Sequence, residues 1–332
     1  MFLFITPRGK PISNIFLACY LMVLAIHMGL NFLFEEFPAS PFPNITNTLG
    51  FLYGPLLFLY VRSMVVKGEY FSFRSAFHFL PWVFFTALWF FLKIDWLGIF
   101  ILIQEVVYIV LTIVTIRNFQ KALLQTQSRY HALSLNWLLQ FLYFIILVAL
   151  IDGLNSWFRF SNDFSTITFI LLLLTLLLFV NALVFKGLRQ PILFGGISQE
   201  EISILRELTK ERTIALEPEG QVIAEKLTLF MSQQKPYLKP ELSLEELSRD
   251  TGFGIRMLSN VINTVFKTNF SDYINEYRIK HAQNLLETTK RSQKTVSEIM
   301  YESGFNSKSS FYLTFKNKMG ISPSDYRKNI GK

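Results

Sequence analysis

Seven side chains near the C-terminal end of this chain have the chemistry needed to hydrogen-bond nucleic acid. Arginine can bind a guanine and asparagine an adenine through two hydrogen bonds, while basic and hydroxyl groups suit phosphates. The alternative for each side chain is that it is a solvated surface residue. The candidates for DNA contact are Arg256, Ser259, Asn260 and Asn263 in one stretch, and Lys308, Ser309 and Tyr312 in another.

The sequence contains no comparable set of residues for catalysis or for metal binding. It has no glycine-rich phosphate loop and no His-Glu-x-x-His motif. Cys19 is the only cysteine, which excludes an intrachain disulfide and a cysteine-based metal cluster. We therefore expect a protein that is not an enzyme and that uses no cofactor.

Both stretches belong to one pattern that occurs twice, 52 positions apart. Each copy begins with S/T-x-x-E, at 243–246 and 295–298, which is the capping box that starts a helix. Each short helix then meets a glycine, Gly252 or Gly304, which can adopt the positive φ of a tight turn. The second helix of each copy has an apolar face made of Ile255, Leu258, Val261, Ile262 and Val265, or of Phe311, Phe315 and Met319. Two helices around such a turn are typical of a helix-turn-helix unit, whose second helix enters the DNA major groove.

This region resembles the DNA-binding domain of AraC/XylS-type bacterial transcription regulators. The matching segments are LSLEEL at 242–247, LS at 258–259, FSDYINEYR at 270–278, Ala282, LL at 285–286, GFNSKSSF at 304–311, FK at 315–316, Gly320 and SPSDYR at 322–327. The resemblance implies two helix-turn-helix units joined by a long helix, here 271–287. It also implies that this helix separates the two units by close to one repeat of the duplex, about 34 Å.

Two features depart from what the resemblance leads us to expect. Leu313 stands where many members of the family carry a basic residue, and leucine cannot donate a hydrogen bond. Residues 241–332 hold 14 Lys and Arg against 10 Asp and Glu, so the net charge of +4 is modest for a DNA-binding domain. We therefore expect binding of double-stranded DNA to depend on a homodimer, or on both units straddling one turn of duplex.

The preceding half of the chain is far more apolar. The mean hydropathy of the whole chain is +0.35. Residues 1–190 carry only 12 Lys and Arg and 7 Asp and Glu, against 20 and 17 in residues 191–332. Six apolar segments approach the roughly 20 residues that a helix needs to cross a bilayer. They lie at about 14–34, 45–66, 76–92, 96–116, 135–151 and 164–185.

Basic residues fit a topology with both termini in the cytoplasm. With six crossings, ten Lys and Arg fall in inside segments and only Lys93 and Arg159 in outside loops, as the positive-inside rule requires. Segments 54–62 and 78–81 resemble the multi-helix membrane sensor region that precedes some AraC-type domains. Relatives often have one more helix at the start, so the apolar residues 1–5 are either a remnant of it or an interfacial anchor.

Polar residues inside the apolar segments suggest contacts between helices or a sensor site. Glu105 lies near the middle of the fourth segment, where a carboxylate is costly. It is either a sensor residue that meets a ligand or a proton, or a group that joins helices. The polar residues expected to hydrogen-bond between helices are His27, Asn31, Gln104 and Gln140. Gly50 and Gly54 have the spacing that lets two helices approach closely.

The sequence thus predicts an all-α protein with a six-helix transmembrane bundle followed by a soluble AraC-like domain. We expect a transmembrane sensor domain at 1–190, a helical linker at 191–234 and a double helix-turn-helix domain at 235–332. A linker helix at about 219–233 either packs on the DNA-binding domain or forms a dimer stalk. The predicted function is that of a one-component regulator in the bacterial inner membrane, answering a small-molecule or membrane signal. The alternative is a membrane receptor or transport-associated protein whose C-terminal domain binds a protein partner.

Overall fold

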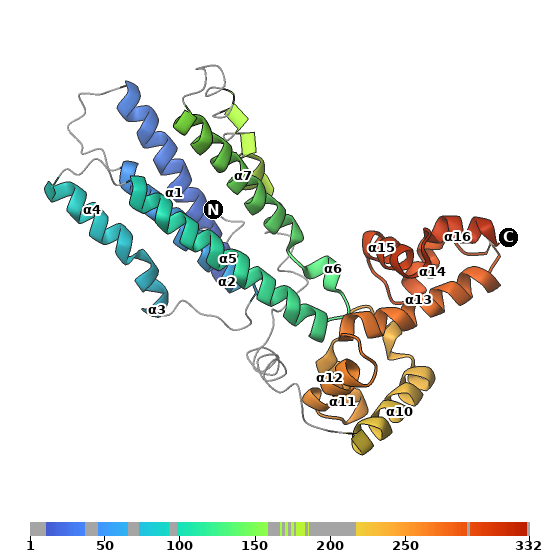
Figure 1. Cartoon of the computed structure of the whole chain (residues 1–332). Helices are drawn as coiled ribbons and strands as arrows, with labels where there is room; N and C mark the ends of the chain where they lie inside the picture. The colour runs from blue at the N-terminus through green and yellow to red at the C-terminus, as the bar shows by residue number, and fades with distance from the viewer. Residues whose placement is uncertain are drawn as a thin grey trace. The chain divides into compact units, whose positions relative to one another are not determined.

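The computed structural model describes most of the chain as helices (Figure 1). The described residues are 11–36, 46–65, 73–92, 98–158, 167, 170–171, 174–175, 177–182, 185, 217–290 and 293–330. The chain forms two compact units, one of Met1–Asn118 and Leu135–Ser198, the other of Phe119–Ser134 and Gln199–Lys332. For the described residues, the prediction of an all-α protein is confirmed.

The described part of the first unit consists mainly of long apolar helices. They are α1 (Pro11–Glu36), α2 (Thr46–Val65), α4 (Leu80–Leu92), most of α5 (Gly98–Thr126), and α7 (Asn136–Phe158). The short α3 (Phe73–Ala76) and η2 (Phe77–Phe79) precede α4. Three described helices contain a stretch long and apolar enough to cross a membrane, at Ile12–Leu30, Thr48–Val65 and Gly98–Thr126. The helices α1, α2, α4, α5 and α7 overlap the first five predicted segments, whereas much of the sixth, 164–185, lies outside the described residues.

Small residues allow α2 and α5 to pack closely. A β-carbon placed on Gly50 would lie 2.9 Å from the side chain of Ile101, and one on Gly54 would lie 2.8 Å from that of Tyr108. Real β-carbons essentially never lie this close to other heavy atoms, so a larger residue at either position would force a neighbour to shift. At Gly54 that neighbour is the Tyr108 β-carbon, which is fixed to the backbone of α5. The predicted close approach of two helices at the Gly50 and Gly54 pair is therefore confirmed.

The second unit contains the repeated pattern. Its helices are α6 (Tyr130–Leu133), α10 (Glu217–Gln234), η3 (Pro236–Leu238), α11 (Leu244–Thr251), α12 (Ile255–Thr264), α13 (Phe270–Thr288), α14 (Val296–Glu302), α15 (Lys308–Met319) and α16 (Pro323–Asn329). Both predicted capping boxes form, at Ser243 with Glu246 before α11 and at Thr295 with Glu298 before α14. The predicted helix–turn–helix pairs are α11 with α12 and α14 with α15.

The single helix α13 supplies residues to two separate hydrophobic cores. Phe270, Tyr273 and Ile274 belong to the core shared with α11 and α12. Ile279, Ala282 and Leu286 belong to the core shared with α14 and α15. Because each fully buried large apolar side chain stabilises the fold by about 1.5–3 kcal/mol, these residues hold both helix pairs firmly against α13.

The linker helix α10 packs on the first helix pair. Leu227 and Met231 are fully buried in its core, and Ile223 and Ala224 pack against Val261 of α12. The opposite side of α10 leaves Val222 and Leu229 exposed. The described part therefore favours packing for this helix, with Val222 outside the packed face.

Candidate nucleic-acid interface

The helix α12 has one face in the core and one face available for polar contacts. Leu258, Val261 and Ile262 are buried, which confirms the predicted apolar face. The turn before α12 is possible because Gly252 has φ of 75°. Arg256 is exposed on α12 and Asn260 is partly exposed.

Two other candidates on α12 are already engaged within the protein. Ser259 is only 2% exposed. The Asn263 side-chain amide Nδ2 donates to the Ser259 carbonyl oxygen at 2.8 Å and to Gln125 Oε1 at 3.0 Å. A contact of either side chain with a base would need a rearrangement of these neighbours.

The helix α15 presents its candidates at its first two turns. Its core side chains are Phe311, Thr314 and Phe315, all buried. Lys308 and Ser309 are exposed, and the Lys308 ammonium lies 5.5 Å from the centre of the Tyr312 ring. The Tyr312 hydroxyl also lies 2.9 Å from Ser324 Oγ. Leu313 is 45% exposed on this helix.

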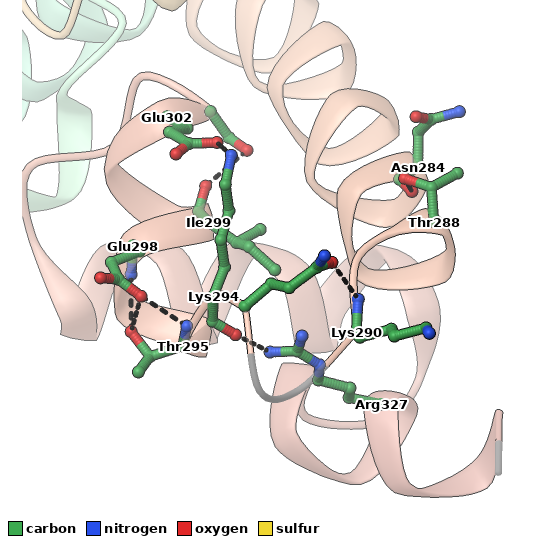
Figure 2. A network of polar contacts seen from close by, with 11 residues as sticks. Asn284, Thr288, Lys290, Lys294, Thr295, Glu298, Ile299, Glu302 and Arg327 are labelled. Carbon is green, nitrogen blue, oxygen red and sulfur yellow. Dashed lines mark hydrogen bonds and ion pairs between the residues drawn. The ribbon is translucent and has the colours of Figure 1, made fainter. Parts of the chain in front are cut away.

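A buried arginine fixes the second helix pair against the rest of the unit. Arg327 of α16 donates to the carbonyl oxygen of Lys294 at 2.7 Å, just before α14 (Figure 2). It also donates to the carbonyl oxygen of Thr289 at 3.1 Å, just after α13. Beside it, the Lys294 ammonium pairs with Glu302 at 2.6 Å. These bonds join both ends of α14 to the C-terminal helix α16.

A second buried arginine joins the two helix pairs. Arg278 of α13 donates to the carbonyl oxygens of Tyr237 and Lys239, both at 2.7 Å, and its guanidinium lies 5.6 Å from the centre of the Phe305 ring. Burial, together with the nearby positive charge of Arg129, lowers the pKa of Arg278 to about 9, so it stays charged at neutral pH.

Comparison with known proteins identifies this double unit. Residues 242–329 match a family model described as a helix-turn-helix domain. The match supports the predicted AraC/XylS-type domain in this region. The chain is 30% identical over 126 residues to the HTH-type transcriptional regulator ExsA of Pseudomonas aeruginosa, covering 38% of this chain and 39% of that protein. No solved structure matches the chain.

Two further relatives are similar over the same kind of region. The virulence regulon transcriptional activator VirF of Yersinia enterocolitica is 30% identical over 140 residues, covering 41% of this chain and 49% of that protein. The melibiose operon regulatory protein of Escherichia coli is 30% identical over 87 residues, covering 26% and 28%. The chain therefore matches less than half the length of these relatives, and the likeness concerns the AraC-type domain.

Within the AraC-type domain, the candidate residues differ in how far they are exposed. Arg256, Lys308 and Ser309 are exposed at the two second helices. Ser259 is buried, and Asn260, Asn263 and Tyr312 are partly exposed. DNA contact by all seven candidates stays a prediction.

Sequence reasoning missed three residues that the structure brings to this domain. Gln125, Ser128 and Arg129 come from a segment more than one hundred positions earlier in the chain, yet they contact Asn263, Arg278 and Glu241 respectively. Each contact is a single polar bond between distant positions, which leaves no periodic signal in the sequence.

Glu105 is tied to the backbone of α2. Its Oε1 accepts a hydrogen bond from the Gly54 backbone N–H at 2.9 Å. The neighbouring Gln104 donates to the Phe51 carbonyl oxygen at 2.7 Å. Pro55 has no N–H, so the Phe51 carbonyl lacks its usual partner within the helix, and Gln104 supplies one. This geometry supports the structural reading of Glu105, while its sensor role stays a prediction.

The other polar residues of the apolar helices differ in their surroundings. His27 Nδ1 lies 2.6 Å from the Tyr53 hydroxyl, which joins α1 to α2 as predicted. Gln140 is exposed, and the side chain of Asn31 lies outside the described residues. Gln104 and His27 thus confirm the prediction of polar bonds between helices.

Proposed function

We propose that this protein is a membrane-bound one-component transcription regulator that binds promoter DNA sequence-specifically. The observation that supports this most strongly is the pair of helix-turn-helix units mounted on one continuous helix. The 19 residues of α13 correspond to about 28 Å of helix at 1.5 Å per residue. That length is close to one repeat of duplex DNA, so α12 and α15 can enter successive major grooves on one face.

Electrostatics and hydrogen bonding suggest roles for the exposed candidates. Arg256 is suited to grip a guanine, or a phosphate beside it, from the first groove-reading helix. Lys308 and Ser309 stand at the start of α15, where they suit phosphate or base contact. The modest net charge of +4 over residues 241–332 favours a homodimer on DNA, because the affinities of two domains then combine.

The apolar helices support a location in the bacterial inner membrane. Besides length and composition, α5 exposes Leu102, Val106 and Val110, each more than half accessible and spaced four residues apart. A continuous apolar stripe of this kind is costly in water and favourable in lipid. Six crossings with both termini in the cytoplasm place the AraC-type domain where DNA is, and leave the first unit to receive a small-molecule or membrane signal.

One observation favours a second function. Leu313, half-exposed on the second groove-reading helix, suits an apolar partner better than a phosphate. The second candidate is therefore a membrane receptor or transport-associated protein whose C-terminal domain binds another protein.

A binding selection distinguishes the two functions. Full-length protein in lipid nanodiscs is incubated with a library of random duplexes, and the bound duplexes are sequenced over several rounds. A regulator enriches one sequence pattern. Arg256→Ala then weakens binding of the enriched duplex by about 5- to 150-fold, because a good two-bond base contact contributes about 1–3 kcal/mol. Lys226→Ala, at an exposed position of α10, removes one positive charge elsewhere and serves as the control. Absence of any enriched pattern at low salt favours the protein-binding alternative.

A further inference from the structure

The segment Phe119–Ser134 lies in the same compact unit as the AraC-type domain. It comprises the end of α5, a turn and α6. We refer to this segment as the clasp. In the chain it connects the apolar helix α5 directly to the apolar helix α7, which begins at Asn136.

The clasp pairs with the residues that precede α11. Gln127 and Ser243 form an antiparallel bridge, and the Ser128 backbone N–H donates to the Leu242 carbonyl oxygen at 3.3 Å. The largely buried Arg129 forms an ion pair with the exposed Glu241. The clasp is therefore held at the start of the first helix-turn-helix unit by backbone and side-chain bonds together.

The same segment also reaches the buried arginine of α13. Ser128 Oγ accepts a hydrogen bond from Arg278 Nη2 at 3.2 Å. Arg278 Nη2 also donates to Lys239 and Pro240, on the segment that leads into α11. A displaced clasp would thus remove one bond from Arg278 and leave its carbonyl partners in place.

Its contact with α12 falls on the residues predicted to read DNA. Gln125 Oε1 accepts from Asn263 Nδ2 at 3.0 Å. Ser259 lies four residues before Asn263, hence on the same side of the helix, and is 2% exposed. A side chain that reads a base edge must be open to the groove, and the Asn263 amide is held by Gln125 while the clasp is docked.

We propose that the clasp is an autoinhibitory contact that withholds one side of α12 from DNA until it is released. This inference rests on the proposed function, because it needs α12 to be a groove-reading helix. The docked form holds the Asn263 amide through Gln125, and release removes this bond on the side of α12 that also carries the exposed Arg256. The contacts on the groove-reading side are single polar bonds, which suit a reversible interaction. The helices α5 and α7 are the covalent route by which a signal in the first unit reaches the clasp.

An engineered disulfide tests the proposal in the full chain. Directly opposed residues of an antiparallel bridge have Cα atoms about 4.5–5.5 Å apart, within the range that a disulfide spans. Gln127→Cys and Ser243→Cys are combined with Cys19→Ser, so that the new pair holds the only thiols. The protein in nanodiscs is oxidised, and its affinity for the duplex enriched by the binding selection is compared with that of the reduced form. The expected result is at least tenfold weaker binding when oxidised, with recovery on reduction.

Matched variants separate the effect of the disulfide from that of the substitutions. The single variant Ser243→Cys loses the same cap oxygen of α11, and its affinity should not respond to reductant. Gln125→Ala should tighten binding severalfold by removing the clasp's bond to Asn263. Gln233→Ala, at an exposed position of α10, should leave the affinity unchanged.

The possible outcomes bear on different claims. If no disulfide forms under oxidant, the clasp does not dock at α11 and the proposal is wrong. If the disulfide forms and both redox states bind DNA equally, the autoinhibitory role is wrong while the proposed function stands. If neither state nor any variant binds any duplex selectively, the proposed function itself is contradicted, and the clasp's role with it.

Discussion

Replacing Gly304 with alanine should destabilise the AraC-type domain far more than the same change at Gly252. Both glycines have positive φ, 82° and 75°. An alanine in this left-handed region costs about 1–2 kcal/mol at either position. The two sites differ in their surroundings. A β-carbon at Gly252 meets nothing within 4 Å, whereas one at Gly304 would lie 2.5 Å from the Tyr237 carbonyl oxygen.

The extra cost at Gly304 arises because the obstructing atoms are backbone. The same β-carbon would also lie 3.0 Å from Leu238 Cα, so the helix η3 must move as a whole. The Tyr237 carbonyl cannot retreat freely, since it accepts the hydrogen bond from Arg278 Nε. Overpacking of this kind costs about 1–3 kcal/mol. We therefore expect a loss of about 1–2 kcal/mol for Gly252→Ala and about 2–5 kcal/mol for Gly304→Ala.

Pulse proteolysis of the full chain in detergent, across a urea series, measures both losses. The fraction of intact AraC-type domain reports its unfolding equilibrium, and wild-type protein gives the reference midpoint. Equal midpoints for the two variants would refute the steric reasoning, because the backbone strain alone is the same at both glycines.

Three further predictions concern single polar groups. Arg278→Met should destabilise the domain by about 3 kcal/mol or more in the same assay, since it leaves buried carbonyl oxygens unpaired. Arg278→Lys should restore less than half of this loss, because one ammonium group cannot reproduce the hydrogen bonds of the planar guanidinium group. Full restoration by lysine would contradict this. Glu105→Gln should keep the thermal stability of the first unit in detergent, since an amide oxygen can still accept from the Gly54 N–H. Glu105→Leu should lower this stability. Equal melting temperatures of the two variants would refute the structural role. Hydrogen bonds from the backbone N–H and hydroxyl of Thr295 lower the pKa of Glu298 below its ordinary 4.5, so its contribution is present above pH 4.5 and is lost as the pH falls through the lowered pKa. Urea midpoints measured across that acid range should therefore fall less steeply for Glu298→Gln than for wild type, and parallel curves would contradict the assignment.

Local signals allowed much of the AraC-type domain to be predicted from sequence. The capping boxes at Ser243 and Thr295 mark helix starts because the hydroxyl and the carboxylate lie three positions apart. The buried faces of α12 and α15 follow from the spacing of apolar residues along one side of each helix. The long α13, Phe270–Thr288, matches the predicted 271–287 within one residue at each end.

Contacts between distant parts of the chain could not be predicted. Asn263 and Gln125 are 138 positions apart, and Arg278 and Ser128 are 150 apart. Ser259 is a candidate for DNA contact because of its hydroxyl group, and only the folded chain shows that it is 2% exposed. Such features depend on tertiary arrangement, which single-sequence patterns do not encode.

The central claim is that the two helix-turn-helix units read DNA inside the cell. Mapping chromosomal occupancy of the full-length protein by crosslinking and immunoprecipitation, beside Arg256→Ala at matched abundance, tests it most directly. The account predicts discrete occupied sites that share one sequence pattern and fade in the variant. Uniform, identical crosslinking of both proteins along the chromosome would contradict it.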